Sequence, residues 1–221
     1  MLTVIKVGGG LAGEAGDDAL RALCAQIAEA GARHPLLVVP GGGEFADAVR
    51  AHDGRFGLRS QTAHRMAILA MDQFGLALAD LIPGAVLRLD LAPVRAGAVA
   101  VLLPAALLGE RDPLPESWAV TSDSIAAWVA GAAGSGRLVL VKPVAGLYAT
   151  WPPAGEPITQ LTVDELAAVQ PEGVDGHLPT ALRTARVETW VIGGREPARL
   201  AELLDDGRTA GTLVTAPLTR P

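Results

Sequence analysis

The stretch Val4–Gly10, "VIKVGGG", places one lysine in an apolar, β-branched run and follows it with three glycines. Such a run predicts a short strand buried within a parallel sheet. Further along, "LLVVPGGG" at 36–43 is again an apolar run followed by three glycines, but it has no lysine. Glycines let backbone amides approach an anion closely, and the helix after each loop favours negative charge at its start. We therefore expect two phosphate-binding loops that face each other at the carboxyl ends of neighbouring strands.

The rest of the chain alternates predicted strands with predicted helices. A helix is expected from Asp17 or Asp18 to near Gly31. Further strands are expected near 35–40, 85–89, 98–104, 137–142, 187–194 and 211–215, and further helices near 43–52, 60–82, 120–131, 162–169, 178–185 and 196–207. This alternation predicts an α/β fold in which helices cover both faces of a mainly parallel sheet. A proline-rich loop at 109–117 is a candidate lid over a site.

Composition narrows the class of protein. Of the 221 residues, 50% are apolar and 19% are charged, and the net charge is −6, so no basic footprint for nucleic acid exists. The single cysteine, Cys24, cannot form an internal disulfide, which favours a reducing compartment. The start of the sequence shows no signal-peptide pattern, and no apolar run is long enough to cross a bilayer. We expect a cytoplasmic globular protein.

Lysine is scarce in this chain. The 18 basic residues comprise sixteen arginines and two lysines, Lys6 and Lys142, and both lysines lie in β-rich runs beside loops. A compact ammonium suits one phosphate oxygen among crowded backbone amides better than a planar guanidinium does. Lys6 is therefore expected to stabilise charge on a phosphoryl group in transit between the two loops, which is the main demand of phosphoryl transfer.

Other interpretations of these motifs stay open. Gly8, Gly10 and Gly13 fit the GxGxxG pattern of a nicotinamide-dependent oxidoreductase, but the acid expected some 20 residues later is missing. No GxxxxGK[ST] motif occurs. The glycine runs could also be simple tight turns. Asp123, in "TSDSIAAW", could be an ordinary helix-capping residue, and the arginines upstream of His64 could belong to a solvated surface.

Six pieces in order, "VIKVGGG", "VVPGGGEFADAVR", "TSDSIAAW", "LVLVKPVAGLY", "VIGG" and "GTLVT", resemble the amino acid kinase family over most of the chain. The resemblance implies a three-layer αβα sandwich around a mainly parallel sheet. It implies one domain over 1–221, with the phosphoryl acceptor bound by about 1–135 and ATP by about 136–221. It further implies ATP and Mg²⁺ as cofactors, a small-molecule substrate, and assembly as a homo-oligomer.

The resemblance also assigns roles to residues. It implies catalytic roles for Lys6, which stabilises the transferring group, and for Asp123, which organises the catalytic lysines. The expected ATP-binding residues are Gly8, Gly9, Gly10, Lys142, Gly146, Tyr148 and Arg183, and the expected substrate-binding residues are Gly41, Gly42, Gly43, His64 and Arg65. No protein residue is expected to ligate a metal.

One position departs from the family pattern. Many members carry a second catalytic lysine where this chain has Thr180. Either Lys142 or Arg183 substitutes for it, or the chain is a non-catalytic member that binds a nucleotide or another anion.

The stretches "SQTAHRMAILAMDQFG" and "SWAVTSDSIAAWVAG" resemble the small kinases of methanofuran-type cofactor biosynthesis, which phosphorylate an aminomethylfuran methyl phosphate. A phosphate monoester acceptor is therefore expected, with its phosphate near His64 and Arg65. Uridylate, isopentenyl phosphate and an acylated amino acid are the alternative acceptors.

Overall fold

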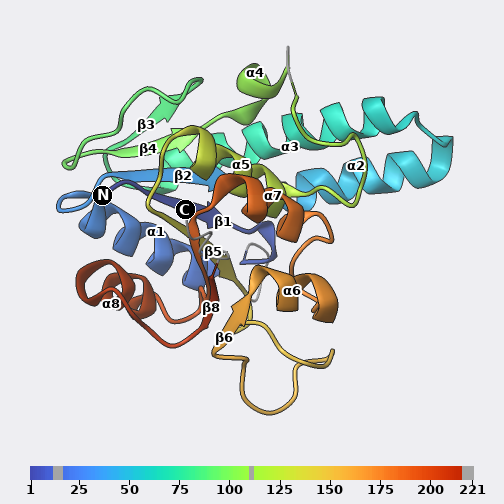
Figure 1. Cartoon of the computed structure of the whole chain (residues 1–221). Helices are drawn as coiled ribbons and strands as arrows, with labels where there is room; N and C mark the ends of the chain where they lie inside the picture. The colour runs from blue at the N-terminus through green and yellow to red at the C-terminus, as the bar shows by residue number, and fades with distance from the viewer. Residues whose placement is uncertain (12–16, 110–111, 216–221) are drawn as a thin grey trace.

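Within residues 1–11, 17–109 and 112–215, the part of the chain that the computed structural model describes, eight strands form one sheet (Figure 1). Their order is β3-β4-β2-β1-β5-β7-β8-β6, and every neighbouring pair is parallel except β7 and β8. The strands are β1 (Thr3–Val7), β2 (Leu36–Pro40), β3 (Ala85–Arg88), β4 (Val99–Leu102), β5 (Arg137–Lys142), β6 (Gln160–Thr162), β7 (Glu188–Gly193) and β8 (Thr212–Thr215). The predicted mainly parallel sheet is confirmed.

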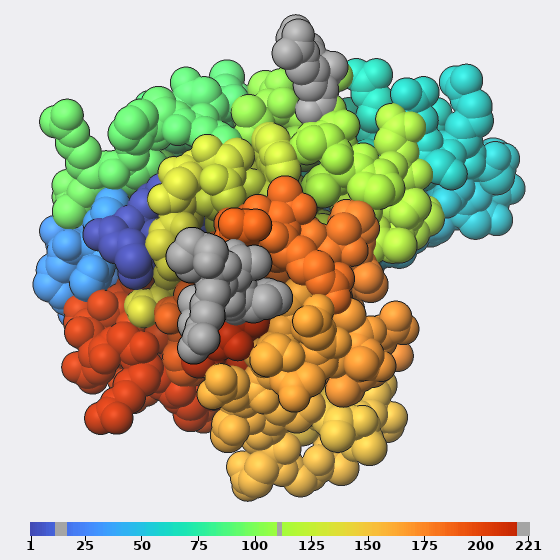
Figure 2. All heavy atoms as spheres, in the orientation of Figure 1, coloured from blue at the N-terminus to red at the C-terminus, as the bar shows by residue number. Residues whose placement is uncertain are grey.

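Helices cover both faces of this sheet. They are α1 (Asp17–Gly31), α2 (Gly43–Phe56), α3 (Ser60–Leu81), α4 (Pro104–Leu108), α5 (Ser122–Ala132), α6 (Val163–Val169), α7 (Leu178–Ala185) and α8 (Ala198–Asp206). In Figure 1, α1 and α8 lie on one side of the sheet, and α5 and α7 lie on the other. The three-layer αβα architecture is therefore confirmed. In Figure 2, the α2–α3 pair and the segment around β6 and α6 project from the same side of the molecule, with an indentation between them.

The alternation of side chains along a strand decides which way the two lysines face. On β1, Ile5 packs into the apolar cluster under α1, whereas Val4 packs into the cluster under α5. Lys6 lies two residues after Val4 and so shares the α5 face. On β5, Leu140 packs with Val4, and Lys142 is two residues further on. Strand periodicity thus directs both lysines toward α5.

The sheet order separates the chain into two halves. Strands β1 to β4 come from residues before 135 and occupy one side of the sheet, and β5 to β8 occupy the other. The halves meet where β1 pairs with β5, with Lys6 opposite Leu140. The assignment of acceptor and ATP to these halves remains a prediction.

Three elements were not expected from the sequence: β6, α4 and the single 3-10 turn at Gly9–Leu11. β6 and the 3-10 turn have three residues each, which is too short to leave a periodic pattern. The strand expected to extend to Pro104 ends at Leu102, because Pro104 begins α4 at a position where its missing N–H costs nothing. Gly13 and positions 110–111 of the proline-rich loop lie outside the described residues. Within the described chain, none of the helices has the length and apolar character needed to span a bilayer.

Candidate active site

Lys6, Asp123 and Lys142 meet at the carboxyl ends of β1 and β5. The ammonium nitrogen Nζ of Lys6 lies 2.9 Å from Oδ1 of Asp123, and Nζ of Lys142 donates to Oδ2 over 2.6 Å. Their side chains are only 6%, 4% and 10% exposed for Lys6, Asp123 and Lys142. One carboxylate therefore holds two ammonium groups side by side, and the cluster carries one excess positive charge when all three groups are ionised.

The start of α5 fixes Asp123. The side chain of Thr121 caps the helix and accepts a hydrogen bond from the Asp123 N–H over 3.4 Å. Asp175, from the loop before α7, accepts from the N–H of Thr121 (2.8 Å) and from the N–H of Ser124 (3.0 Å), and also from both of their hydroxyls. Asp175 thereby fastens the first turn of α5. Asp175 was not among the expected site residues, because an acid in a loop gives no signal of the helix that it caps.

Burial and charge act on the cluster in opposite directions. Burial disfavours the charged form of Asp123, but the two ammonium groups together outweigh it and hold its pKa well below the ordinary value. Burial and the neighbouring charge of Lys6 lower the pKa of Lys142 to about 8, although Asp123 and Asp175 counteract them. At neutral pH the cluster is thus poised to receive a further negative charge, such as that of a phosphate.

The two glycine loops are pressed against each other. A Cβ added at Gly9 would lie 2.0 Å from Cα of Gly43, and one at Gly41 would lie 2.9 Å from the backbone N of Gly9. Gly43 begins α2 with a φ of +55°, which also favours glycine. The predicted face-to-face arrangement of the loops is confirmed. The loops are so close at Gly9 and Gly41 that a residue with a side chain would not fit there.

A cavity of about 460 Å³ opens between these loops and the lysine cluster. Its lining comprises the three charged residues of the cluster together with Gly9, Gly10, Gly42, Gly43, Glu44, Ala46, Asp47, Arg50, Thr121 and Ser122. The N-termini of α2 and α5 both lie at this cavity, so backbone N–H groups and helix dipoles add to the positive potential. The arrangement suits binding of several phosphate groups at once.

Four residues predicted to bind ATP do not line this cavity. Gly8 lies next to it, since an added Cβ there would lie 3.1 Å from Nζ of Lys6. Gly146 packs against Thr212, whose Oγ1 would lie 2.8 Å from an added Cβ. Arg183 forms an exposed ion pair with Asp164 over 2.8 Å on the outer surface of α7. Tyr148 is also absent from the lining. Their roles toward ATP remain predictions. Thr180 is exposed on α7, so the second ammonium at Asp123 comes from Lys142 on β5 instead.

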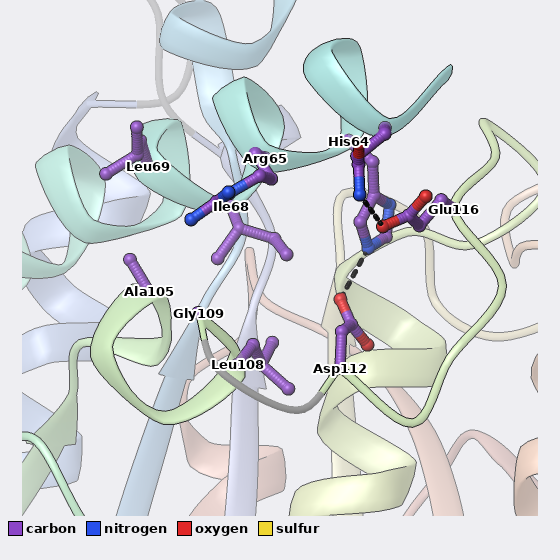
Figure 3. Close-up of a pocket in the computed structure, with 10 residues that line it drawn as sticks. His64, Arg65, Ile68, Leu69, Ala105, Leu108, Gly109, Asp112 and Glu116 are labelled. Carbon is purple, nitrogen blue, oxygen red and sulfur yellow. Dashed lines mark hydrogen bonds and ion pairs between the residues drawn. The ribbon is translucent and has the colours of Figure 1, made fainter. Parts of the chain in front are cut away.

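His64 and Arg65 lie at a separate pocket of about 240 Å³ between α3, α4 and the segment after it (Figure 3). The ring atom Nε2 of His64 lies 2.7 Å from Oδ2 of Asp112. Neither residue lines the cavity at the lysine cluster, although His64 also lines a narrow cavity that reaches Gly42, and their role as substrate ligands remains a prediction.

The described side chains at the site do not offer a set of free ligands to a metal ion. Both carboxylate oxygens of Asp123 already face ammonium groups. No group of three or more His, Cys, Asp or Glu side chains suited to a cation occurs within the described residues. The protein side chains of the site do not form a cage for Mg²⁺.

The sequence matches the profile of the amino acid kinase family over residues 1–192. The chain belongs to the amino acid kinase family. A relative from Methanocaldococcus jannaschii, named (5-(aminomethyl)furan-3-yl)methyl phosphate kinase, is 28% identical over 91% of this chain and 92% of its own length. Acetylglutamate kinase from Frankia casuarinae is 38% identical over 44% of this chain and 28% of its own length.

Solved structures of the family share the fold. Uridylate kinase from Archaeoglobus fulgidus superposes with a TM-score of 0.75 over 97% of this chain and all of the other, at 19% identity. UMP kinase from Bacillus anthracis gives a TM-score of 0.73 over 97% of this chain and 95% of the other, at 15% identity. The protein is thus a kinase of this family by sequence, and its fold is the one found in these uridylate kinases.

Proposed function

We propose that this kinase transfers the γ-phosphoryl group of ATP to a small phosphate monoester. The observation that carries the proposal is the buried Lys6–Asp123–Lys142 cluster beside two abutting glycine loops. The loops supply anion sites on two neighbouring strands, so two phosphorylated ligands can meet end to end above the cluster.

In the proposed reaction, an oxygen of the acceptor phosphate attacks the γ-phosphorus, and the bond from that phosphorus to the β,γ-bridging oxygen breaks. ADP takes the electron pair, and the acceptor becomes a diphosphate. Lys6 and Lys142 stabilise the negative charge that spreads over the transferring group, and Asp123 holds both ammonium groups in place. Backbone N–H groups of the glycine loops position the two phosphates in line.

We further propose that Lys142 supplies the second cation that Thr180 lacks. Lys142 contacts Asp123 directly, whereas the guanidinium of Arg183 is engaged by Asp164 on the surface. This arrangement favours a catalyst over a non-catalytic anion binder. ATP use follows from the family. Any Mg²⁺ would be held by nucleotide phosphates and water, and the protein side chains would contribute charge stabilisation.

The phosphorylated acceptor is proposed from the relative that the chain matches nearly end to end, which is named for an aminomethylfuran methyl phosphate. A cytoplasmic location and a homo-oligomeric assembly remain predictions.

The test is acceptor-dependent release of ADP from ATP, measured with a coupled assay, across aminomethylfuran methyl phosphate, uridylate, isopentenyl phosphate and acetylglutamate. Turnover with one phosphate monoester, with the diphosphate identified by mass spectrometry, supports the proposal. Tight ATP binding without turnover of any acceptor would favour the non-catalytic binder.

A further inference from the structure

A second, narrow cavity extends from the lysine site toward α3. It has a volume of about 50 Å³ and shares Gly42, Arg50 and Ser122 with the cavity that holds Lys6. Its walls are mainly apolar and include Ile68, Met71, Trp118 and Val120. A passage of this size and lining selects a slender or planar apolar group over a bulky or charged one.

Trp118 closes this passage from the side of the proline-rich loop. The guanidinium carbon of Arg50 lies 5.0 Å from the centre of the Trp118 ring, and the indole Nε1 donates to Oδ2 of Asp53 over 2.7 Å. Both contacts tie the loop to α2. These contacts therefore hold the walls of the passage in place. The Arg50 guanidinium lies at the end nearer the lysine cluster.

The passage leads into the pocket shown in Figure 3, with which it shares His64 and Ile68. Met71, Ile68 and His64 lie on one face of α3 at helical spacing, so this row spans about 10 Å at a rise of roughly 1.5 Å per residue. An elongated molecule with its phosphate at the glycine loops would therefore place its opposite end beside His64.

The chemistry at that far end favours a cation. The His64 side chain is 4% exposed and the Asp112 side chain is 13% exposed, and their 2.7 Å contact lies at the pocket wall. Oδ1 of Asp112 accepts from the N–H of Leu114, and Glu116 accepts from Gln61 over 3.2 Å. Arg65 also lines the pocket, but its side chain points away from Asp112 and Glu116 in Figure 3. A second phosphate at this end would face two carboxylates.

We propose that Asp112 and Glu116 bind the ammonium group of the aminomethylfuran methyl phosphate acceptor, at the end remote from its phosphate. His64 acts as a positioning residue, because its ring nitrogen orients the Asp112 carboxylate. The inference rests on the proposed function and adds the residues that recognise the amine of a slender or planar acceptor. His64 then lies at the amine end of the acceptor and not at the phosphate end, where it was expected.

The experiment compares two acceptors, aminomethylfuran methyl phosphate and the analogue in which a methyl group replaces the aminomethyl group. Wild type is expected to prefer the amine by at least about 10-fold in kcat/KM. Asp112→Asn should lower kcat/KM for the amine roughly 10- to 100-fold, mainly through KM, and change the methyl analogue less than about 2-fold. Glu116→Gln should act in the same direction. Asp80→Asn, an exposed charge on α3, is the matched control and should change neither.

Equal use of both acceptors by wild type, or an equal loss with both in Asp112→Asn, would overturn the inference while leaving the kinase assignment intact. If the wild-type protein phosphorylates neither acceptor, the proposed function fails. Calorimetric titration of the two compounds without ATP then still tests whether Asp112 binds the amine. Binding of the amine compound that Asp112→Asn abolishes supports the inference, and absence of binding to wild type overturns it. Thermal unfolding of each variant separates lost recognition from lost folding.

Discussion

At the residue scale, the Lys6–Asp123–Lys142 cluster places three ionised groups almost out of contact with water. Burial makes each charge costly, and the cost is offset only because each ammonium is paired with an oxygen of the same carboxylate. One positive charge is left over, and no described acid other than Asp123 forms an ion pair with either lysine. A bound phosphate would complete the neutralisation, so the cluster is better suited to ligand binding than to fold stability alone.

The lowered pKa of Lys142 predicts a pH dependence for the reaction. Lys142 loses its proton as the pH rises through about 8, and the neutral amine no longer stabilises the transferring group. We expect kcat/KM for the acceptor to fall above pH 8 by about tenfold per pH unit. In Lys142→Arg, which stays charged, the decline should move to higher pH. A flat profile up to pH 10 in the wild type would rule out this role for Lys142.

Two substitutions identify which cation replaces the missing family lysine. Lys142→Met should lower kcat at least about 100-fold, because a charge at the transferring group is lost. Arg183→Met removes an exposed ion pair with Asp164 and should change kcat less than about 2-fold. Steady-state kinetics on both variants provides the measurement. The reverse ranking would assign the second cation to Arg183.

At the scale of elements, the two glycine loops are in direct backbone contact, and the proposed reaction depends on this contact to position the ligands. Gly9→Ala would place a Cβ 2.0 Å from Cα of Gly43 and force the loops apart, so we expect activity to fall more than about 100-fold. Gly54→Ala is the matched control in α2, where an added Cβ meets nothing within 4 Å. It should preserve activity and raise the free energy of unfolding by about 0.5–1 kcal/mol. Normal turnover by Gly9→Ala would show that the loop contact is dispensable.

Asp175 links α5 to the loop before α7, and its removal should affect both stability and chemistry. Asp175→Ala leaves N–H groups at the start of α5 without acceptors, so we expect a loss of about 2–3 kcal/mol in urea unfolding. Because Asp123 lies in the same turn, kcat should fall more than KM rises. Glu165→Ala removes the capping-box acid of α6 and should lower the free energy of unfolding slightly without changing kcat. Equal effects of the two variants on kcat would refute the role of Asp175.

At the scale of the whole molecule, the sequence predicted most of the fold because strands and helices here have strong periodicity and clear ends. The buried runs of β1 and β5 and the apolar face of α1 were each evident from their residues. Short elements such as β6 were not, because three residues hold no period. Beyond the neighbouring strands β1 and β2, the order of the strands was also out of reach, since the pairing of β1 with β5 joins residues far apart in the chain.

The geometry of the candidate site was predicted in part for the same reason. Lys6, the glycine loops and Asp123 could each be recognised from the residues next to them in the sequence. The contact of Lys142 with Asp123 was one of the alternatives that the sequence left open. The caps provided by Asp175 and the passage closed by Trp118 were not expected, because they arise from contacts between distant segments. Local pattern cannot encode these contacts, because they depend on which strands become neighbours.

In the proposed reaction, the fold holds the cluster of Lys6, Asp123 and Lys142 against two phosphorylated ligands. The most direct measurement is the rate of ADP and diphosphate formation from ATP and aminomethylfuran methyl phosphate by wild type and Lys6→Ala. We predict a loss of about three or more orders of magnitude in kcat for Lys6→Ala, with the folded state retained in circular dichroism. A folded Lys6→Ala variant that turns over at the wild-type rate would rule out the proposed role of the cluster.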